Sequence, residues 1–158
     1  MSTKILAARH AQAKGGAFAD DFLRPLSDEG RKVQKQMAEL LKGEGWKLDQ
    51  IWSSPLLRAR ESAEVIASVF GLKEVLEQPA LGDAFDAEAL LASFPKEQTL
   101  LLVGHAPSLA AFVKALTREA RALDHLETSE VAVLEFPGEI AFGEADLVAR
   151  YKPPDLGR

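Results

Sequence analysis

Arginine and histidine stand side by side at positions 9 and 10, directly after the apolar run of residues 5–8. Near neutral pH much of a histidine is unprotonated, and its imidazole can attack an electrophile or move a proton. The arginine beside it is a permanent, forked cation that suits a phosphate or another oxyanion. The pair therefore indicates phosphoryl chemistry, although two basic residues that merely end a strand explain it equally well when taken alone.

Two further predicted strands end in groups of the same kind. Residues 48–52 are expected to form a short strand that runs into Ser53-Ser54-Pro55-Leu56-Leu57-Arg58, and the buried strand 99–103 runs into Gly104-His105. In open α/β sheets the ligand crevice lies beyond the carboxyl ends of the strands, and right-handed crossovers bring those ends to one edge. His105 taken alone would be interpreted as a cap of the next helix. Together, four side chains are expected to share one pocket: Arg9, His10, Arg58 and His105.

The elements that would hold these groups alternate along the chain. Residues 28–42 have helical spacing of apolar side chains, with Ser27 as the predicted N-cap and Gly43 and Gly45 at the end. Ser54 is the predicted N-cap of the next helix, with Pro55 at its first position. The remaining expected elements are an edge strand near 75–76, helices over 87–94 and 109–116, an antiparallel strand pair over 131–136 and 145–151, and a loose tail over 152–158. This order predicts a three-layer α/β/α sandwich with a mixed, mostly parallel central sheet.

Composition narrows the class of protein. The 158 residues fit one domain, residues 1–158, and the 47% hydrophobic and 27% charged content is that of a soluble globular chain. A net charge of −5 argues against nucleic acid as a partner, and no apolar run reaches the length of a membrane span. The chain has no cysteine and no segment that resembles a secretory leader, so we expect a cytoplasmic protein. Nucleotide binding loses support because neither GxxxxGK[ST] nor GxGxxG occurs.

An ordered set of motifs, spread from Lys4 to about Phe136, resembles one known family. The motifs are Arg9-His10-Ala11, Arg24-Pro25-Leu26-Ser27-Asp28-Glu29-Gly30, Ser53-Ser54-Pro55-Leu56-Leu57-Arg58-Ala59 and Val103-Gly104-His105. In this order they are similar to the histidine phosphatase (phosphoglycerate mutase-like) superfamily. The short chain, the Ala after Arg-His and the Asp-Asp-x-x-Arg-Pro-Leu run of residues 20–26 resemble its SixA-type phosphohistidine phosphatase branch.

The resemblance implies a role for each of the four groups. His10 would be the nucleophile that is transiently phosphorylated, and Arg9, Arg58 and His105 would bind the phosphoryl oxygens, with His105 also counted as catalytic. The chemistry agrees, because a neutral imidazole can attack phosphorus without a strong base and cationic groups offset charge on the equatorial oxygens. The expected enzyme is metal-independent and needs no cofactor, and none of the three histidines has metal-binding spacing. We expect a monomer or a weak homodimer.

The chain departs from the family pattern at two places. Ala11 replaces the glycine of the usual Arg-His-Gly, which is tolerable where the backbone φ is negative. Larger relatives carry a Glu after the edge strand as general acid for an alcohol leaving group, and this chain has none there. Asp83 is the nearest substitute, with Asp86 behind it, although a carboxylate in such a loop is more often simply solvated. A weak acid is consistent with phosphohistidine as substrate, because its P–N bond is intrinsically labile.

The remaining predictions concern access to the pocket. Residues 71–98 leave little chain for a lid, so the pocket should be shallow and open, as a protein-borne substrate requires. Arg24 would either line the entrance or pair with Asp20 or Asp21. Thr128 and Ser129 precede a strand, and their position alone does not place them relative to the pocket.

Three alternative functions stay open at this point. The substrate is a phosphorylated protein or, alternatively, a small phosphorylated molecule cleaved by a phosphomonoesterase of the same fold. A mutase is disfavoured, since it must shield its phosphoenzyme from water. A non-catalytic module that only recognises phosphate would not need an unprotonated histidine in line with the phosphorus.

Overall fold

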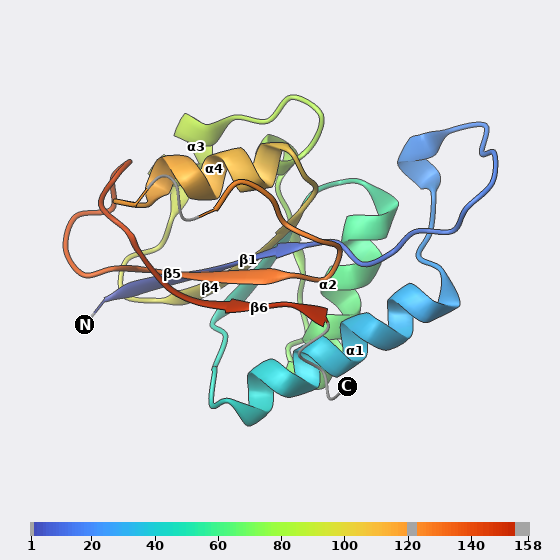
Figure 1. Ribbon diagram of the computed structural model, residues 1–158, viewed down its shortest axis with the longest axis horizontal. Helices are drawn as coiled ribbons and strands as arrows, with labels where there is room; N and C mark the ends of the chain where they lie inside the picture. The colour runs from blue at the N-terminus through green and yellow to red at the C-terminus, as the bar shows by residue number, and fades with distance from the viewer. Residues whose placement is uncertain (1, 120–122, 154–158) are drawn as a thin grey trace.

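Six strands form one mixed sheet in the computed structural model, which describes residues 2–119 and 123–153 (Figure 1). Their order across the sheet is β3-β2-β4-β1-β5-β6. The first four run parallel, whereas β5 is antiparallel to both β1 and β6. The bounds are β1 Thr3–Arg9, β2 Gln50–Ser53, β3 Leu76–Glu77, β4 Thr99–Gly104, β5 Val131–Phe136 and β6 Asp146–Tyr151.

Helices cover both faces of the sheet because the strands alternate their buried side chains between two cores (Figure 1). Ile5 and Ala7 of β1 face one core, which α3 and α4 close, and Leu6 and Ala8 face the other, which α1 and α2 close. The helices are α1 Asp28–Gly43, α2 Leu57–Phe70, α3 Ala87–Ser93 and α4 Ser108–Leu116, with short 3-10 turns η1 Asp21–Leu23 and η2 Pro79–Leu81. The predicted three-layer α/β/α sandwich with a mixed, mostly parallel sheet is confirmed.

One predicted helix start is wrong, and sheet pairing explains why. Ser27 caps α1 as expected, its hydroxyl accepting a hydrogen bond from the Gly30 amide at 2.9 Å. Ser54, in contrast, does not cap α2, which begins at Leu57. The Ser54 amide donates to the Val103 carbonyl at 2.9 Å, so the chain stays extended beyond β2, and the Ser54 hydroxyl accepts from the Leu56 amide at 3.2 Å in a turn before the helix.

The other elements lie close to their predicted positions. β2 begins two residues later than expected, and β3 is a two-residue edge strand. The predicted loose tail of residues 152–158 lies outside the described residues from position 154 onwards. Of the helices within the described ranges, none combines the length and apolar character that crossing a membrane requires.

Candidate active site

The carboxyl ends of three neighbouring parallel strands meet at one edge of the sheet. β1 lies beside β4 with Arg9 opposite Gly104, and β4 lies beside β2 with Val103 opposite Ser53. The His10 amide continues this pairing by donating to the Gly104 carbonyl at 2.9 Å. The first residues after the strands therefore emerge next to one another, as the sequence predicted for His10 and His105.

The His10 imidazole is held in one tautomer and kept neutral. His10 is only 7% exposed, and its Nδ1 lies 2.7 Å from the Ala11 carbonyl oxygen. Because a carbonyl can only accept, Nδ1 carries the hydrogen and Nε2 keeps a free electron pair. Burial above all, helped by the nearby charges of Arg58, Arg9 and His105, lowers the pKa of His10 from 6.5 to about 4, against a smaller rise from the Ala11 hydrogen bond. At neutral pH this side chain is unprotonated, and the electron pair on its Nε2 is able to attack an electrophile.

Arg9 points from β1 to backbone groups at the start of β5. Its Nη1 donates to the Leu126 carbonyl at 2.9 Å, and its amide donates to the Glu130 carbonyl at 3.0 Å. Burial, and then the charge of Arg58, lower the pKa of its guanidinium. Its buried Nε has no hydrogen-bond partner within residues 2–119 and 123–153, which leaves a donor of this cation available to an anion.

A buried ion pair supports the segment that holds Arg9. The Glu130 carboxylate is fully buried and accepts from Arg150 Nε of β6 at 2.6 Å. Its other oxygen accepts from the Glu127 amide at 2.8 Å, while Arg150 Nη2 donates to the His125 carbonyl at 3.0 Å. Sequence reasoning missed Glu130, because a glutamate is rarely buried unless it is paired and the spacing does not reveal its pairing with Arg150 on another strand.

Ser129 lies against His10, which the sequence alone could not establish for residues 128 and 129. Its amide donates to the His10 carbonyl at 3.2 Å, so this segment contacts the backbone of His10. Ser129 has a positive φ of 62°, which its buried position maintains.

Arg58, in the first turn of α2, is held from the other side of the site. Its Nη1 donates to the Asp21 carbonyl at 3.0 Å and its Nη2 lies 3.4 Å from the Asp21 carboxylate. The Ser62 hydroxyl, one turn later, donates to the Arg58 carbonyl at 2.8 Å and accepts from the Ala11 amide at 2.9 Å. Ser62 thus links the turn that carries Arg58 to Ala11, the residue after His10.

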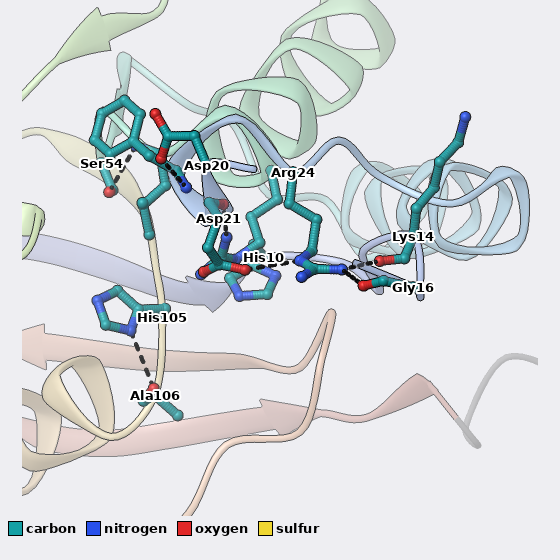
Figure 2. A network of polar contacts seen from close by, with 12 residues as sticks. His10, Lys14, Gly16, Asp20, Asp21, Arg24, Ser54, His105 and Ala106 are labelled. Carbon is teal, nitrogen blue, oxygen red and sulfur yellow. Dashed lines mark hydrogen bonds and ion pairs between the residues drawn. The ribbon is translucent and has the colours of Figure 1, made fainter. Parts of the chain in front are cut away.

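Arg24 takes the second of its two predicted roles, with Asp21 as its partner (Figure 2). Its Nε donates to the Asp21 carboxylate at 2.7 Å, whereas Asp20 instead accepts from the Phe22 amide at 3.0 Å. Hydrogen bonding to Arg24 and then the charge of Arg58 lower the pKa of Asp21, so its carboxylate is ionised. Sequence reasoning did not identify Asp21 as the residue that joins both arginines.

His105 lies at the end of β4 with one ring nitrogen unused (Figure 2). Its Nδ1 is 3.1 Å from the Ala106 carbonyl oxygen, and its Nε2 is buried without a hydrogen-bond partner in the described part of the chain. The helix-cap interpretation is not supported, because the His105 backbone carbonyl, not its ring, accepts from the Leu109 amide at 3.1 Å. In the protonated ring this Nε2 carries a hydrogen, which can be donated to an oxygen of a phosphoryl group.

The two acidic candidates after the edge strand differ from this cluster. Asp86 caps α3, its carboxylate accepting from the Ala89 amide at 3.0 Å. Asp83 is exposed, and across residues 2–119 and 123–153 no hydrogen bond or ion pair joins it to the four predicted groups. No cluster of three or more His, Asp or Glu suited to a metal ion is found in those same ranges.

Comparison with known proteins agrees with this geometry. Residues 5–86 match the model of the histidine phosphatase superfamily (branch 1). An uncharacterized protein of Picosynechococcus sp. is 31% identical over 118 residues, 68% of this chain and 69% of that protein. Phosphohistidine phosphatase SixA of Escherichia coli (strain K12) is 30% identical over 119 residues, 72% of this chain and 73% of that protein. The structure of the protein histidine phosphatase SixA complexed with tungstate has a TM-score of 0.82 at 23% identity, covering 97% of this chain and 99% of that one.

Proposed function

This chain belongs to the histidine phosphatase superfamily, in its SixA-type branch, and from that premise we propose that it dephosphorylates phosphohistidine on proteins through a covalent intermediate on His10. The observation that carries the proposal is the neutral, buried imidazole with its free Nε2 among the charges of Arg58, Arg9 and His105. These groups are suited to phosphoryl transfer, which depends mainly on positioning and electrostatic stabilisation.

Binding comes first in the proposed reaction. The guanidinium groups of Arg9 and Arg58 donate hydrogen bonds to the non-bridging oxygens of the phosphoryl group. His105 in its protonated form donates a further hydrogen bond through Nε2. The unused donor of Arg9 and the unused ring nitrogen of His105 support this assignment, since buried polar atoms seldom stay unpaired once their ligand is bound.

Two displacements then complete the reaction. The electron pair on His10 Nε2 forms a bond to phosphorus while the P–N bond of the substrate breaks, and the released imidazole nitrogen takes up a proton from solvent. Water next attacks the phosphorus of phospho-His10, the new P–N bond breaks, and inorganic phosphate leaves with the imidazole of His10 restored. Written in this way, the reaction uses only side chains of this chain and water.

The substrate is proposed from the leaving group and the relatives. A labile P–N bond needs less help from a general acid than an ester does. Asp83, the first acid proposed from the sequence, is exposed and, within the described residues, makes no hydrogen bond or ion pair with the four groups. The relative SixA of Escherichia coli is named a phosphohistidine phosphatase, which supports the same substrate class here.

Trapping of labelled phosphate tests the proposal. Wild-type protein is mixed with a ³²P-phosphohistidine protein and quenched in alkali, and we expect label on the enzyme that disappears on acid treatment. His10→Asn should carry no label. His125→Asn is the matched control, because this exposed histidine lies outside the site and its change should leave the labelling unaltered.

A substrate panel decides between the two phosphatase classes. Phosphohistidine protein, free phosphohistidine and several small phosphate monoesters are compared by kcat/KM. Faster cleavage of the monoesters than of phosphohistidine would overturn the proposed substrate and favour a small-molecule phosphomonoesterase, and an unlabelled wild type would favour a binding module.

A further inference from the structure

The loop between β1 and α1, residues 13–26, is an ordered structure with its own polar centre. Its base is closed by a β-bridge between Ala13 and Leu26 and by the Lys14 amide, which donates to the Pro25 carbonyl at 2.9 Å. In Figure 1 this blue loop stands out from the body of the molecule, on the side where α2 begins. Such a loop keeps its shape without packing into either core.

Arg24 holds the inside of the loop together (Figure 2). Its Nη1 donates to the Lys14 carbonyl at 2.8 Å and to the Gly16 carbonyl at 3.0 Å, while its Nε binds Asp21. Its guanidinium carbon also lies 4.6 Å from the centre of the Phe18 ring. The loop is therefore organised before any partner arrives, which reduces the entropy lost on binding.

Three large apolar side chains of this loop face solvent. Phe18 is 37% exposed, Phe22 38% and Leu23 57%. The other exposed large apolar side chains within the described residues are isolated on separate elements: Leu76, Phe142 and Val148. Single exposed apolar residues need no explanation, but three within six positions of one ordered loop give it the apolar character that is typical of an interaction surface.

The same loop contacts the phosphate-binding side of the site. Asp21, next to Phe22, receives a hydrogen bond from Arg58 through its carbonyl and an ion pair through its carboxylate. A phosphoryl group bound at Arg58 therefore brings whatever carries it against the loop. A small, polar phosphorylated metabolite gains nothing from exposed aromatic and aliphatic side chains, whereas a folded protein can bury them.

We propose that the β1–α1 loop is a docking surface for the protein that carries the phosphohistidine, with Phe18, Phe22 and Leu23 packing on apolar surface around the modified residue. This inference rests on the proposed function and adds the residues that recognise the protein part of the substrate. Docking at the loop contributes to substrate affinity and leaves the chemistry at His10 unchanged.

The test compares a phosphoprotein with the free amino acid. The double variant Phe22→Ser/Leu23→Ser and the wild type are assayed on a chemically phosphorylated phosphotransfer protein and on free phosphohistidine. We expect kcat/KM on the phosphoprotein to fall by about tenfold or more, mainly through KM, and kcat/KM on free phosphohistidine to stay within about twofold. Phe18 is left intact because Arg24 packs on its ring.

The double variant Phe142→Ser/Val148→Ser is the matched control, since these side chains are equally exposed but lie outside the loop. It should match the wild type on both substrates. Equal activity of the loop variant and the wild type on the phosphoprotein would overturn the docking proposal, as would an equal loss on both substrates. A wild type that cleaves neither phosphohistidine substrate would instead overturn the proposed function, so the two failures are distinguishable.

Discussion

The two arginines of the candidate site are held in opposite ways. Arg9 ends a central strand and donates to backbone carbonyls that a fully buried Glu130 supports from below. Arg58 begins a helix and is held by Asp21, whose side chain is 64% exposed. The interior of the fold thus fixes one half of the proposed phosphate site, and a surface loop fixes the other.

The two halves should therefore differ in how readily their contacts change when substrate binds. Water does not compete for a hydrogen bond to a backbone carbonyl in the interior. The half of the site that contains Arg9 should therefore keep its geometry whether or not substrate is bound. An exposed ion pair is weak and screened by salt, so the Arg58 half can exchange Asp21 for a phosphoryl group at little cost. Changes on the two sides should therefore have different consequences.

The largest effect should come from the arginines themselves. Arg9→Gln and Arg58→Gln should each lower kcat/KM on phosphohistidine by about 10²- to 10³-fold, because each removes a charge that stabilises the transferred group. Only Arg9→Gln should also lower the free energy of unfolding, by about 1–3 kcal/mol, since it deprives the carbonyl of the buried Leu126 of its side-chain donor. Urea unfolding with steady-state kinetics measures both quantities. Arg118→Gln, in the exposed pair with Asp146, is the control, and equal stability losses in the two site variants would refute the comparison.

The next effect tests the support beneath Arg9. Glu130→Ala should lower the free energy of unfolding by about 3 kcal/mol, because it removes the buried carboxylate to which Arg150 and the Glu127 amide both donate. Activity and vanadate affinity should both fall in this variant, because the ion pair no longer fixes the segment that holds Arg9. Glu130→Gln keeps the shape of the side chain and part of its hydrogen bonding. Its vanadate affinity should therefore return closer to the wild-type value than its free energy of unfolding does. Vanadate affinity unchanged in Glu130→Ala would show that the ion pair has no positioning role.

The buried nucleophile predicts a pH effect with a definite sign. The pKa of His10 is about 4 in the folded chain against 6.5 for an ordinary histidine, so protons favour the unfolded state. This contribution to stability is complete above pH 6.5 and is lost as the pH falls through 4, with roughly 2 kcal/mol lost between about pH 7 and about pH 5. Urea unfolding at the two pH values should show a smaller drop in His10→Gln than in the wild type. His125→Gln should behave as the wild type, and identical drops in all three proteins would contradict the lowered pKa.

The smallest effect should come from the exposed half. Asp21→Asn removes the negative charge that competes with an anion for Arg58, so inhibition by inorganic phosphate should strengthen by about twofold to fivefold at low salt. High salt should erase the difference between the variant and the wild type. Asp20→Asn is the matched control, because the Asp20 side chain contacts the Phe22 amide and not Arg58. Weaker inhibition in Asp21→Asn would mean that Asp21 positions Arg58 for the anion instead of competing with it.

The sequence predicted the interior half of the site better than the exposed half. Residues 5–8 and 99–103 are unbroken apolar runs, and parallel pairing of such runs leaves few positions for the residues after them. Asp21 was missed as a partner of Arg58 because the path of a loop depends on contacts such as those of Arg24. No periodic pattern in the sequence reveals such contacts. The Glu130–Arg150 pair spans two strands, and its register could not be derived from spacing. The prediction of Ser54 as a helix N-cap was wrong, because pairing of its backbone with β4 outweighed the local preference of serine for an N-cap position.

The closed base of the β1–α1 loop has a practical consequence. Because a β-bridge between Ala13 and Leu26 closes the base of the loop, the residues between them can be exchanged for those of a relative without altering β1 or His10. Grafting this insert with Asp21 retained, because Asp21 also holds Arg58, would show whether partner choice is transferred together with the loop.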